Sequence, residues 1–361
     1  MNQSDIPHLR LRNQRLIGAA GVAPSSPEEV VGWLVAVQAQ DYAGAKWALR
    51  LRMQAGTGDR IDQALEQGSI LRTHLLRPTW HFVTPADIRW LLALNAPRIQ
   101  AGNATMYRQQ GLDAATLQRS QAALVKALEG GNQLTRLELR IALENAGIVT
   151  GEGLRLVYIL MCAELEGVIC SGGRRGRQFT YALLDERVPP ARMLERPEAL
   201  AELTWRYFLS RGPATLHDYV KWSGLTIADA RSGLEDVKDR LVQAEVGGQV
   251  YWLPDSTPPG EAISPNVHLL SIFDEYISGY KDRRAIADVQ IGPALIAMGN
   301  ALTYIIVVNG QIVGTWRRDL KSSSVLIETT LFKPLTEAEE QAVAAGFQRY
   351  GEFLELPVVM A

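Results

Sequence analysis

Apolar residues recur with a helical period at the start of the chain, and two glutamines follow directly. Ser26 and Pro27 are typical of a helix start, and Glu29 predicts a capping box. The apolar stripe that follows consists of Val30, Val31, Leu34, Val35 and Val37. Residues two apart point to nearly opposite sides of a helix, so Gln38 and Gln40 can act together only if the helix ends or loosens here. The alternative interpretation is a polar helix end exposed to water.

The order of a winged helix follows from the next elements. The pattern predicts helices over residues 43–53 and 60–67, then β-forming residues over 70–83 that are broken at Pro78. Three helices followed by a hairpin are typical of that fold. Further helices are predicted to start near Pro85 and Asp113.

The same order recurs twice. Thr135 and Glu138 form a second capping box, a long helix is predicted over residues 151–166, and two strands flank a basic glycine-rich turn at 171–177. A third set of helices ends in strands joined across residues 247–248, which are both glycine.

Beyond residue 265 the sequence pattern is typical of β-strands. Strands are predicted at 268–273, 303–308, 311–316 and 324–329. Asn309-Gly310 predicts a type I′ turn, and Thr336 with Glu339 predicts a capped final helix.

The predicted fold class is therefore α+β and helix-rich, with three tandem winged-helix domains and a small antiparallel β domain, sheet or barrel-like, that carries a C-terminal helix. The predicted boundaries are 1–130 for the first winged helix with its connecting helices, 131–190 for the second, 191–262 for the third and 263–361 for the β domain.

Composition restricts the function. A net charge of −2 and a pI near 6.3 give no global attraction to nucleic acid, so any such surface must be local. Two cysteines and five histidines without paired ligand spacing predict no metal site, and the sequence predicts no cofactor. Cys162 and Cys170 are expected to be reduced core residues. No targeting or membrane-spanning segment is predicted, so we expect a cytoplasmic protein.

Basic residues cluster on predicted hairpins, often beside an aromatic residue. Arginine suits DNA phosphates because its planar fork donates two bonds to one anion, and an aromatic ring can stack on an unstacked base. A solvated turn is the alternative for each cluster. The candidate DNA-binding residues are Arg72, Arg77, Trp80, His81, Arg174, Arg175, Arg177, Tyr280, Lys281, Arg283, Arg284, Arg317 and Arg318.

Three motifs resemble a known family. They are VQAQD at 37–41, LLRPTWHFV at 75–83, and FDEY at 273–276 with KDR at 281–283. They are similar to those of the bacterial tandem winged-helix proteins that include the DNA glycosylases AlkZ and YcaQ. The resemblance implies excision of bulky N-alkylated purines from duplex DNA, in some members from interstrand crosslinks. It also implies a catalytic Gln-x-Gln motif, which Gln38 and Gln40 match, whereas the other branch has aspartate at the second position.

Glutamine has no pKa near neutrality and can only orient a water. The resemblance and this chemistry together predict a monofunctional, monomeric DNA glycosylase for cationic lesions in double-stranded DNA, with Gln38 and Gln40 as catalytic residues. Asp41 is ionisable and is an alternative base. The groove-probing hairpin is either 281–284 or 309–318.

Two other classes of protein stay open. A non-enzymatic winged-helix regulator would prefer one DNA sequence and bind as a dimer, without need of the glutamines. A small-molecule sensor would contain a large apolar pocket and have no affinity for DNA.

Overall fold

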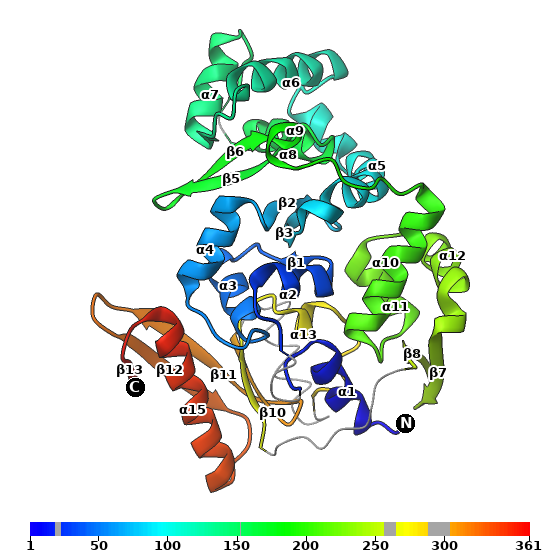
Figure 1. Ribbon diagram of the computed structural model, residues 1–361, viewed down its shortest axis with the longest axis vertical. Helices are drawn as coiled ribbons and strands as arrows, with labels where there is room; N and C mark the ends of the chain where they lie inside the picture. The colour runs from blue at the N-terminus through cyan, green and yellow to red at the C-terminus, as the bar shows by residue number, and fades with distance from the viewer. Residues whose placement is uncertain (19–22, 152, 256–264, 288–303) are drawn as a thin grey trace. The chain divides into compact units, whose positions relative to one another are not determined.

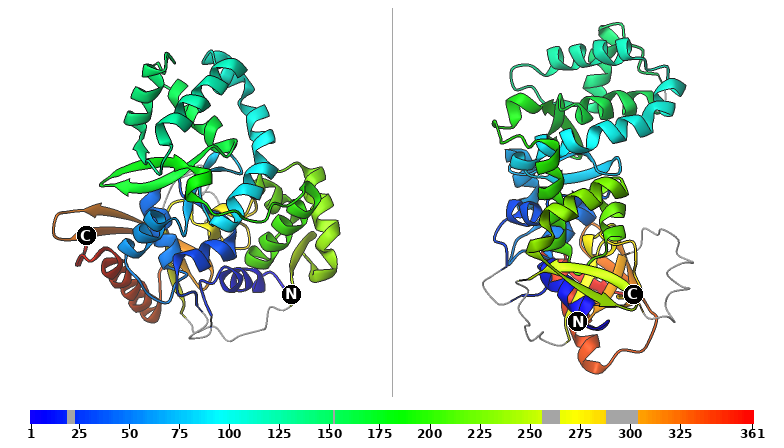
Figure 2. Two further views of the ribbon diagram at one scale, coloured as in Figure 1. Left: turned by 45° about the horizontal axis from the view of Figure 1, so that its top comes forward. Right: turned by 90° about the vertical axis from the view of Figure 1, so that its right-hand side faces the viewer.

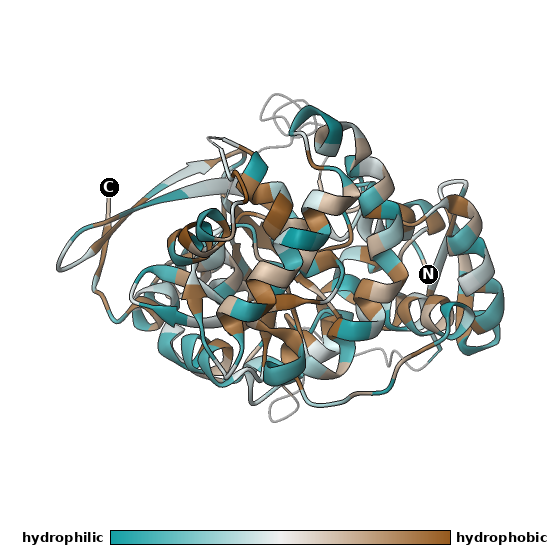
Figure 3. Cartoon of the chain, turned by 90° about the horizontal axis from the view of Figure 1, so that it is seen from above, coloured by the Kyte–Doolittle hydropathy of each residue, from teal (hydrophilic) through white to brown (hydrophobic). Residues whose placement is uncertain are grey.

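The computed structural model describes residues 1–18, 23–151, 153–255, 265–287 and 304–361. The chain divides into two compact units, each described separately below. Unit 1 contains residues 1–61, 201–222 and 226–361, and unit 2 contains residues 62–200 and 223–225. Individual helices carry apolar residues on one side and polar residues on the other (Figure 3), as the sequence pattern predicts.

The N-terminal elements are α1 (Asp5–Asn13), α2 (Pro27–Leu34), β1 (Val37–Gln38), α3 (Tyr42–Arg50) and α4 (Gly58–Gln67). The helices α2, α3 and α4 were predicted, but α2 ends at Leu34, before the last residues of the predicted stripe, and neither α1 nor β1 was predicted. The Ser26 hydroxyl accepts the Glu29 N–H, so Ser26 caps α2 as predicted. The Glu29 carboxylate, however, accepts hydrogen bonds from the N–H and hydroxyl of Ser25, one residue earlier than a capping box requires.

Unit 2 contains two hairpins and the helices between them. Its elements are β2 (Leu71–Leu75), β3 (Thr79–Val83), α5 (Pro85–Gln109), α6 (Ala114–Leu128), β4 (Leu134–Thr135), α7 (Arg136–Asn145), α8 (Arg155–Leu165), β5 (Ile169–Arg175), β6 (Gln178–Leu183) and α9 (Leu184–Arg187). Thr135 and Glu138 form the predicted capping box of α7. The sheet has the order β4-β6-β5, and Figure 2 shows its green β5–β6 hairpin beside the helices of the same unit.

The third set of elements also follows the predicted order. These elements are α10 (Arg196–Arg211), α11 (Leu216–Ser223), α12 (Ile227–Val237), β7 (Leu241–Val246) and β8 (Gln249–Pro254). The turn between β7 and β8 consists of Gly247 and Gly248, which both have positive φ, as a two-residue hairpin of type I′ requires.

The C-terminal sheet of unit 1 has the strand order β13-β12-β11-β10-β9, with the red helix α15 beside it in Figure 1. Its elements are β9 (Val267–Leu270), α13 (Glu275–Ser278), β10 (Tyr304–Val308), β11 (Gln311–Leu320), β12 (Val325–Leu331), α15 (Glu337–Leu354) and β13 (Val358–Met360). Asn309 and Gly310 have φ of 50° and 78° and join β10 to β11, which confirms the predicted turn. The capping box of Thr336 and Glu339 is also confirmed.

One pair of strands in this sheet differs from the predicted antiparallel arrangement. β13 pairs with β12 in parallel, with Val325 opposite Val358. The reason is that α15 connects the two strands and serves as a crossover, which a parallel pair requires. The final residues contributed no recognisable strand pattern of sufficient length to predict this pairing.

The helix-rich α+β class is confirmed, whereas the division into four domains stays a prediction. Cys162 and Cys170 are free and buried, as expected, and burial raises the pKa of each thiol to about 12. Within the described ranges, no helix is long and apolar enough to cross a membrane.

Candidate active site

The turn that carries the two glutamines begins where α2 ends. α2 stops at Leu34, and Val35 adopts a φ of 66° and a ψ of −52°, a γ-turn in which the Ala36 N–H donates to the Leu34 carbonyl. A β-branched residue rarely takes a positive φ. The chain then enters the short strand β1, so the condition that the helix must end before the glutamines is met. Gln38 is buried and Gln40 is exposed, so of the two glutamines only Gln40 is accessible to solvent.

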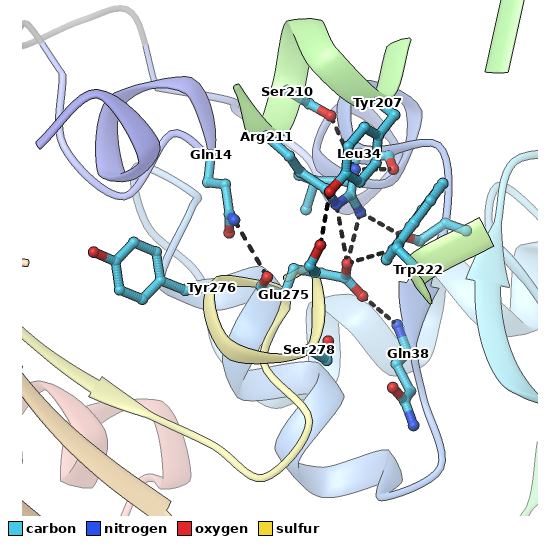
Figure 4. Close-up of polar contacts among 12 residues, drawn as sticks. Gln14, Leu34, Gln38, Tyr207, Ser210, Arg211, Trp222, Glu275, Tyr276 and Ser278 are labelled. Atoms are coloured by element: carbon cyan, nitrogen blue, oxygen red, sulfur yellow. Dashed lines mark hydrogen bonds and ion pairs between the residues drawn. The ribbon is translucent and has the colours of Figure 1, made fainter. Parts of the chain in front are cut away.

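The side chain of Glu275 binds the backbone of this turn. One carboxylate oxygen, Oε1, accepts the Gln38 N–H at 2.9 Å, as Figure 4 shows. The other oxygen, Oε2, lies 2.7 Å from Nη2 of Arg211 and accepts the indole N–H of Trp222 at 3.0 Å. Glu275 is 1% exposed and Arg211 is fully buried. The carboxylate therefore links the glutamine strand to a buried cation.

Arg211, the last residue of α10, also binds the end of α2. Its guanidinium donates to the carbonyls of Leu34 at 3.0 Å and Ala36 at 3.1 Å. Carbonyls at a helix end lack intrahelical partners. Arg211 therefore supplies hydrogen-bond donors to carbonyl oxygens at and just beyond the end of α2. The guanidinium lies 4.3 Å from the ring of Trp222. Arg211 and Glu275 together clamp residues 34–38.

A second buried ion pair lies next to the first. Asp274 binds Arg52 through both carboxylate oxygens, at 2.8 and 2.9 Å, and one of these oxygens also accepts the Tyr276 N–H. Arg52 also donates to the backbone and side chain of Gln14. Consecutive carboxylates of the FDEY motif thus pair with two different arginines, and only Glu275 reaches the glutamine strand.

Asp41 lies at the start of α3 and is half-buried. Its Oδ2 accepts a hydrogen bond from the Tyr304 hydroxyl at 3.1 Å. Burial is the main cause that raises the pKa of Tyr304, so this hydroxyl stays protonated and can donate. A side chain on Gly44 would come within 2.8 Å of the same oxygen, so the glycine leaves the space that Asp41 occupies. A role of Asp41 as a base stays a prediction.

The candidate DNA-binding residues of unit 1 differ in accessibility. Tyr280 is fully buried, donates its hydroxyl hydrogen to the Arg211 carbonyl and lies under the guanidinium of Arg10 at 3.7 Å. In this position Tyr280 is a core residue that supports the clamp and cannot stack on a base. Lys281 and Arg284 are exposed, and Arg284 forms an ion pair with Asp282.

The second basic cluster of unit 1 lies on β11. Arg317 is exposed and opposite Glu328 on β12. Arg318 is half-buried and hydrogen-bonds the Tyr350 hydroxyl. Of these two arginines, Arg317 is therefore the one that is accessible to a phosphate. Arg283, which belongs to the cluster at residues 281–284, is also half-buried.

In unit 2, Arg72, Trp80 and Arg77 lie on or beside the β2–β3 hairpin. Arg72 is buried, and its guanidinium lies 4.0 Å from the centre of the Trp80 ring. Trp80 and Arg77 are half-buried. His81 is fully buried, with Nδ1 at 2.8 Å from the carbonyl oxygen of Thr79, and a contact of His81 with DNA would require the strand to move.

Two of the three arginines near the turn of the β5–β6 hairpin form ion pairs within the protein. Arg175 forms a 2.7 Å ion pair with Glu138, and Arg174 lies 3.5 Å from Asp62. Arg177 is exposed at the tip of the β5–β6 hairpin. Only one of the three predicted phosphate contacts is thus available without breaking an internal ion pair.

In the predicted second winged helix, α8 would be the recognition helix, and it is mostly buried. Its buried residues are Leu156, Ile159, Leu160, Met161, Cys162, Ala163, Glu164 and Leu165. A recognition helix reads base edges with exposed polar side chains. α8 has too few of them to read a groove in this conformation.

The sequence did not predict two residues of the site, Arg211 and Trp222. Neither has a local pattern that distinguishes it from other helical residues. The FDEY motif did point to Glu275, although not to its contact with Gln38. Within the described residues, no group of three or more His, Cys, Asp or Glu side chains could hold a metal ion.

Comparison with known proteins gives consistent matches. A sequence model of the family described as "DNA glycosylase AlkZ-like" matches residues 31–353. An interstrand DNA cross-link repair glycosylase from Streptomyces sahachiroi is 26% identical over 305 residues, which cover 81% of this chain and 82% of that protein.

A solved structure shows the same fold. The structure of the Streptomyces sahachiroi DNA glycosylase AlkZ matches with a TM-score of 0.78 at 21% identity and covers 100% of both chains. At this identity the structural similarity establishes the fold.

Proposed function

The chain belongs to the AlkZ-like DNA glycosylase family, and we propose that it hydrolyses the N-glycosidic bond of cationic, N-alkylated purines in double-stranded DNA. Gln38 and Gln40 position the attacking water, and no metal or cofactor takes part. The relative from Streptomyces sahachiroi is named as a repair glycosylase for interstrand crosslinks, and we extend that substrate class to this chain.

The residue types fit this chemistry. A glutamine amide can orient a water but cannot remove its proton, because it has no pKa near neutrality. Such weak assistance suffices only when the leaving group is already good. An N7-alkylated purine carries a positive charge before the bond breaks, so it leaves without a general acid and an oxocarbenium-like sugar forms, by analogy with glycoside hydrolysis.

The observation that supports the proposal most is the Gln38–Glu275 hydrogen bond. A hydrogen bond to a buried, ion-paired carboxylate fixes the backbone of the first glutamine. Preorganisation of this kind matters for a catalytic group because small misplacements are costly in rate. A merely solvated helix end would have no need of a buried ion pair behind it.

The test is release of free base from duplex DNA that contains N7-methylguanine, and from a nitrogen-mustard crosslink. We expect the wild-type protein to release base from both, and the Gln38→Ala, Gln40→Ala double variant to release none while it still binds DNA. A neutral base such as uracil should stay in place.

Two outcomes would contradict the proposal. The water-positioning role is wrong if Gln40→Glu gains activity on unalkylated bases while Gln40→Ala leaves alkylpurine excision intact. No release from either substrate, with tight binding to undamaged DNA, would favour the regulator.

A further inference from the structure

Unit 2 contains a pocket of about 730 Å³ that is lined by the start of α7, by β3 and by β6. We infer that this pocket binds an unpaired nucleotide of DNA. The inference rests on the proposed function only in taking DNA as the source of the nucleotide. The site lies within unit 2 and shares no residue with the glutamine turn, which belongs to unit 1.

The pocket is strongly cationic. Arg72, Arg136, Arg140 and Arg177 line it, and none of the described residues that line it is acidic. Arg140 forms an ion pair with Glu144, whereas Arg136 and Arg177 are exposed and make no ion pair with any residue that the structure describes. This concentration of charge occurs in a chain with a net charge of −2, so it is local and attracts an anion.

The interior of the pocket is aromatic. Arg72 packs against two rings, with its guanidinium carbon 4.0 Å from the centre of Trp80 and 4.3 Å from that of Phe179. These contacts and its burial restrict the guanidinium, so less side-chain entropy is lost when it binds an anion. Tyr181 and Leu156 add apolar surface. The ligand therefore combines a flat apolar body with a negative charge.

An unpaired nucleotide has both properties. Its base offers a flat face to aromatic and guanidinium groups, and its phosphate accepts bonds from arginine. The volume lies within the usual range of ligand pockets, about 300–1,000 Å³. A paired base cannot enter, because its edge is engaged with the other strand and its faces are stacked. The burial of α8 leaves this helix without the exposed polar side chains that read an intact groove, which favours single-strand contact.

The experiment measures binding of the full-length protein to a single-stranded oligothymidylate that carries one 5-iodouracil, near 150 mM salt. We expect ultraviolet crosslinks at Trp80, Phe179 or Tyr181. The Arg136→Glu, Arg177→Glu double variant should bind about tenfold more weakly, the loss expected for one or two charge-assisted contacts.

The matched control is the Arg108→Glu, Arg119→Glu double variant. These arginines are also exposed in unit 2 and give the same change of net charge, but they do not line the pocket. The control should bind within about twofold of wild type, as residual long-range electrostatics allow.

Three results would overturn the inference. The first is that crosslinks form only outside the pocket, and the second is that the two double variants lose the same affinity for the oligonucleotide. The third is that free thymidine monophosphate or an acidic apolar peptide competes as effectively as the oligonucleotide. The Gln38→Ala, Gln40→Ala variant should bind the oligonucleotide normally. Failure of this inference is thus separable from failure of base excision, which is assayed on N7-methylguanine.

Discussion

The Glu275→Gln substitution tests whether the buried carboxylate positions the strand that carries Gln38. Glu275 receives donors on both oxygens, with the Gln38 N–H on one and Arg211 with Trp222 on the other. Glutamine keeps the shape but has only one acceptor oxygen. That oxygen will face Arg211 and Trp222, where more donors converge, so the amide NH₂ is left opposite the Gln38 N–H.

The expected loss follows from that mismatch. A hydrogen bond to a charged group contributes about 1.5–3 kcal/mol, and each 1.4 kcal/mol corresponds to about tenfold in rate. We therefore expect the single-turnover rate of N7-methylguanine release to fall about 10- to 100-fold if the mismatch displaces Gln38. Affinity for DNA should change by less than about threefold, because Glu275 is buried and its side chain is not accessible to DNA.

Stability needs a control, because removal of one partner from a buried ion pair costs about 3–5 kcal/mol. Asp274→Asn supplies it: the substitution breaks the neighbouring buried pair with Arg52 and leaves the Gln38 contact intact. We expect similar losses of melting temperature in the two variants and a large loss of rate only in Glu275→Gln. A wild-type rate in folded Glu275→Gln, or an equal loss in Asp274→Asn, would refute the positioning role.

Three further predictions concern the scaffold. Burial lowers the pKa of His268 to about 3, so near pH 6 the unfolded chain binds a proton that the folded chain does not. The free energy of unfolding should therefore fall by about 1 kcal/mol between pH 7 and pH 5.5. Melting curves measured across this pH range should show that His268→Leu lacks this loss. Gly310→Ala should destabilise the protein by about 1–3 kcal/mol in denaturant titrations, because φ is 78° and the new Cβ would lie 2.6 Å from Cβ of Pro7; an unchanged midpoint would contradict this strain. Cys162 and Cys170 should resist a thiol reagent in the native state and react after unfolding, since both are buried with a raised pKa; rapid native labelling would show that unit 2 opens.

Local features of the fold were predictable from the sequence because neighbouring residues determine them. The capping boxes at Thr135 and Thr336 and the turn at Asn309 each depend on residues within four positions of one another. The glutamine pair was likewise identified from a local pattern, the end of an apolar helical stripe.

Contacts across the chain were not predictable in the same way. Gln38 and Glu275 are 237 positions apart, and no periodicity encodes their hydrogen bond. Proximity in sequence also misled: Tyr280 precedes a basic run, yet its ring is fully buried under Arg10. The distinction between a ring that faces DNA and one that faces the core depends on tertiary packing, which a single sequence does not specify.

The distance along the chain between Gln38 and Glu275 also bears on biosynthesis. A ribosome adds Glu275 237 residues after Gln38. Until then the charges of Arg211 and Arg52 have no carboxylate partner from this motif, and burying them would be costly. A nascent chain that has not yet reached Glu275 therefore lacks the carboxylate that accepts the Gln38 N–H and pairs with Arg211.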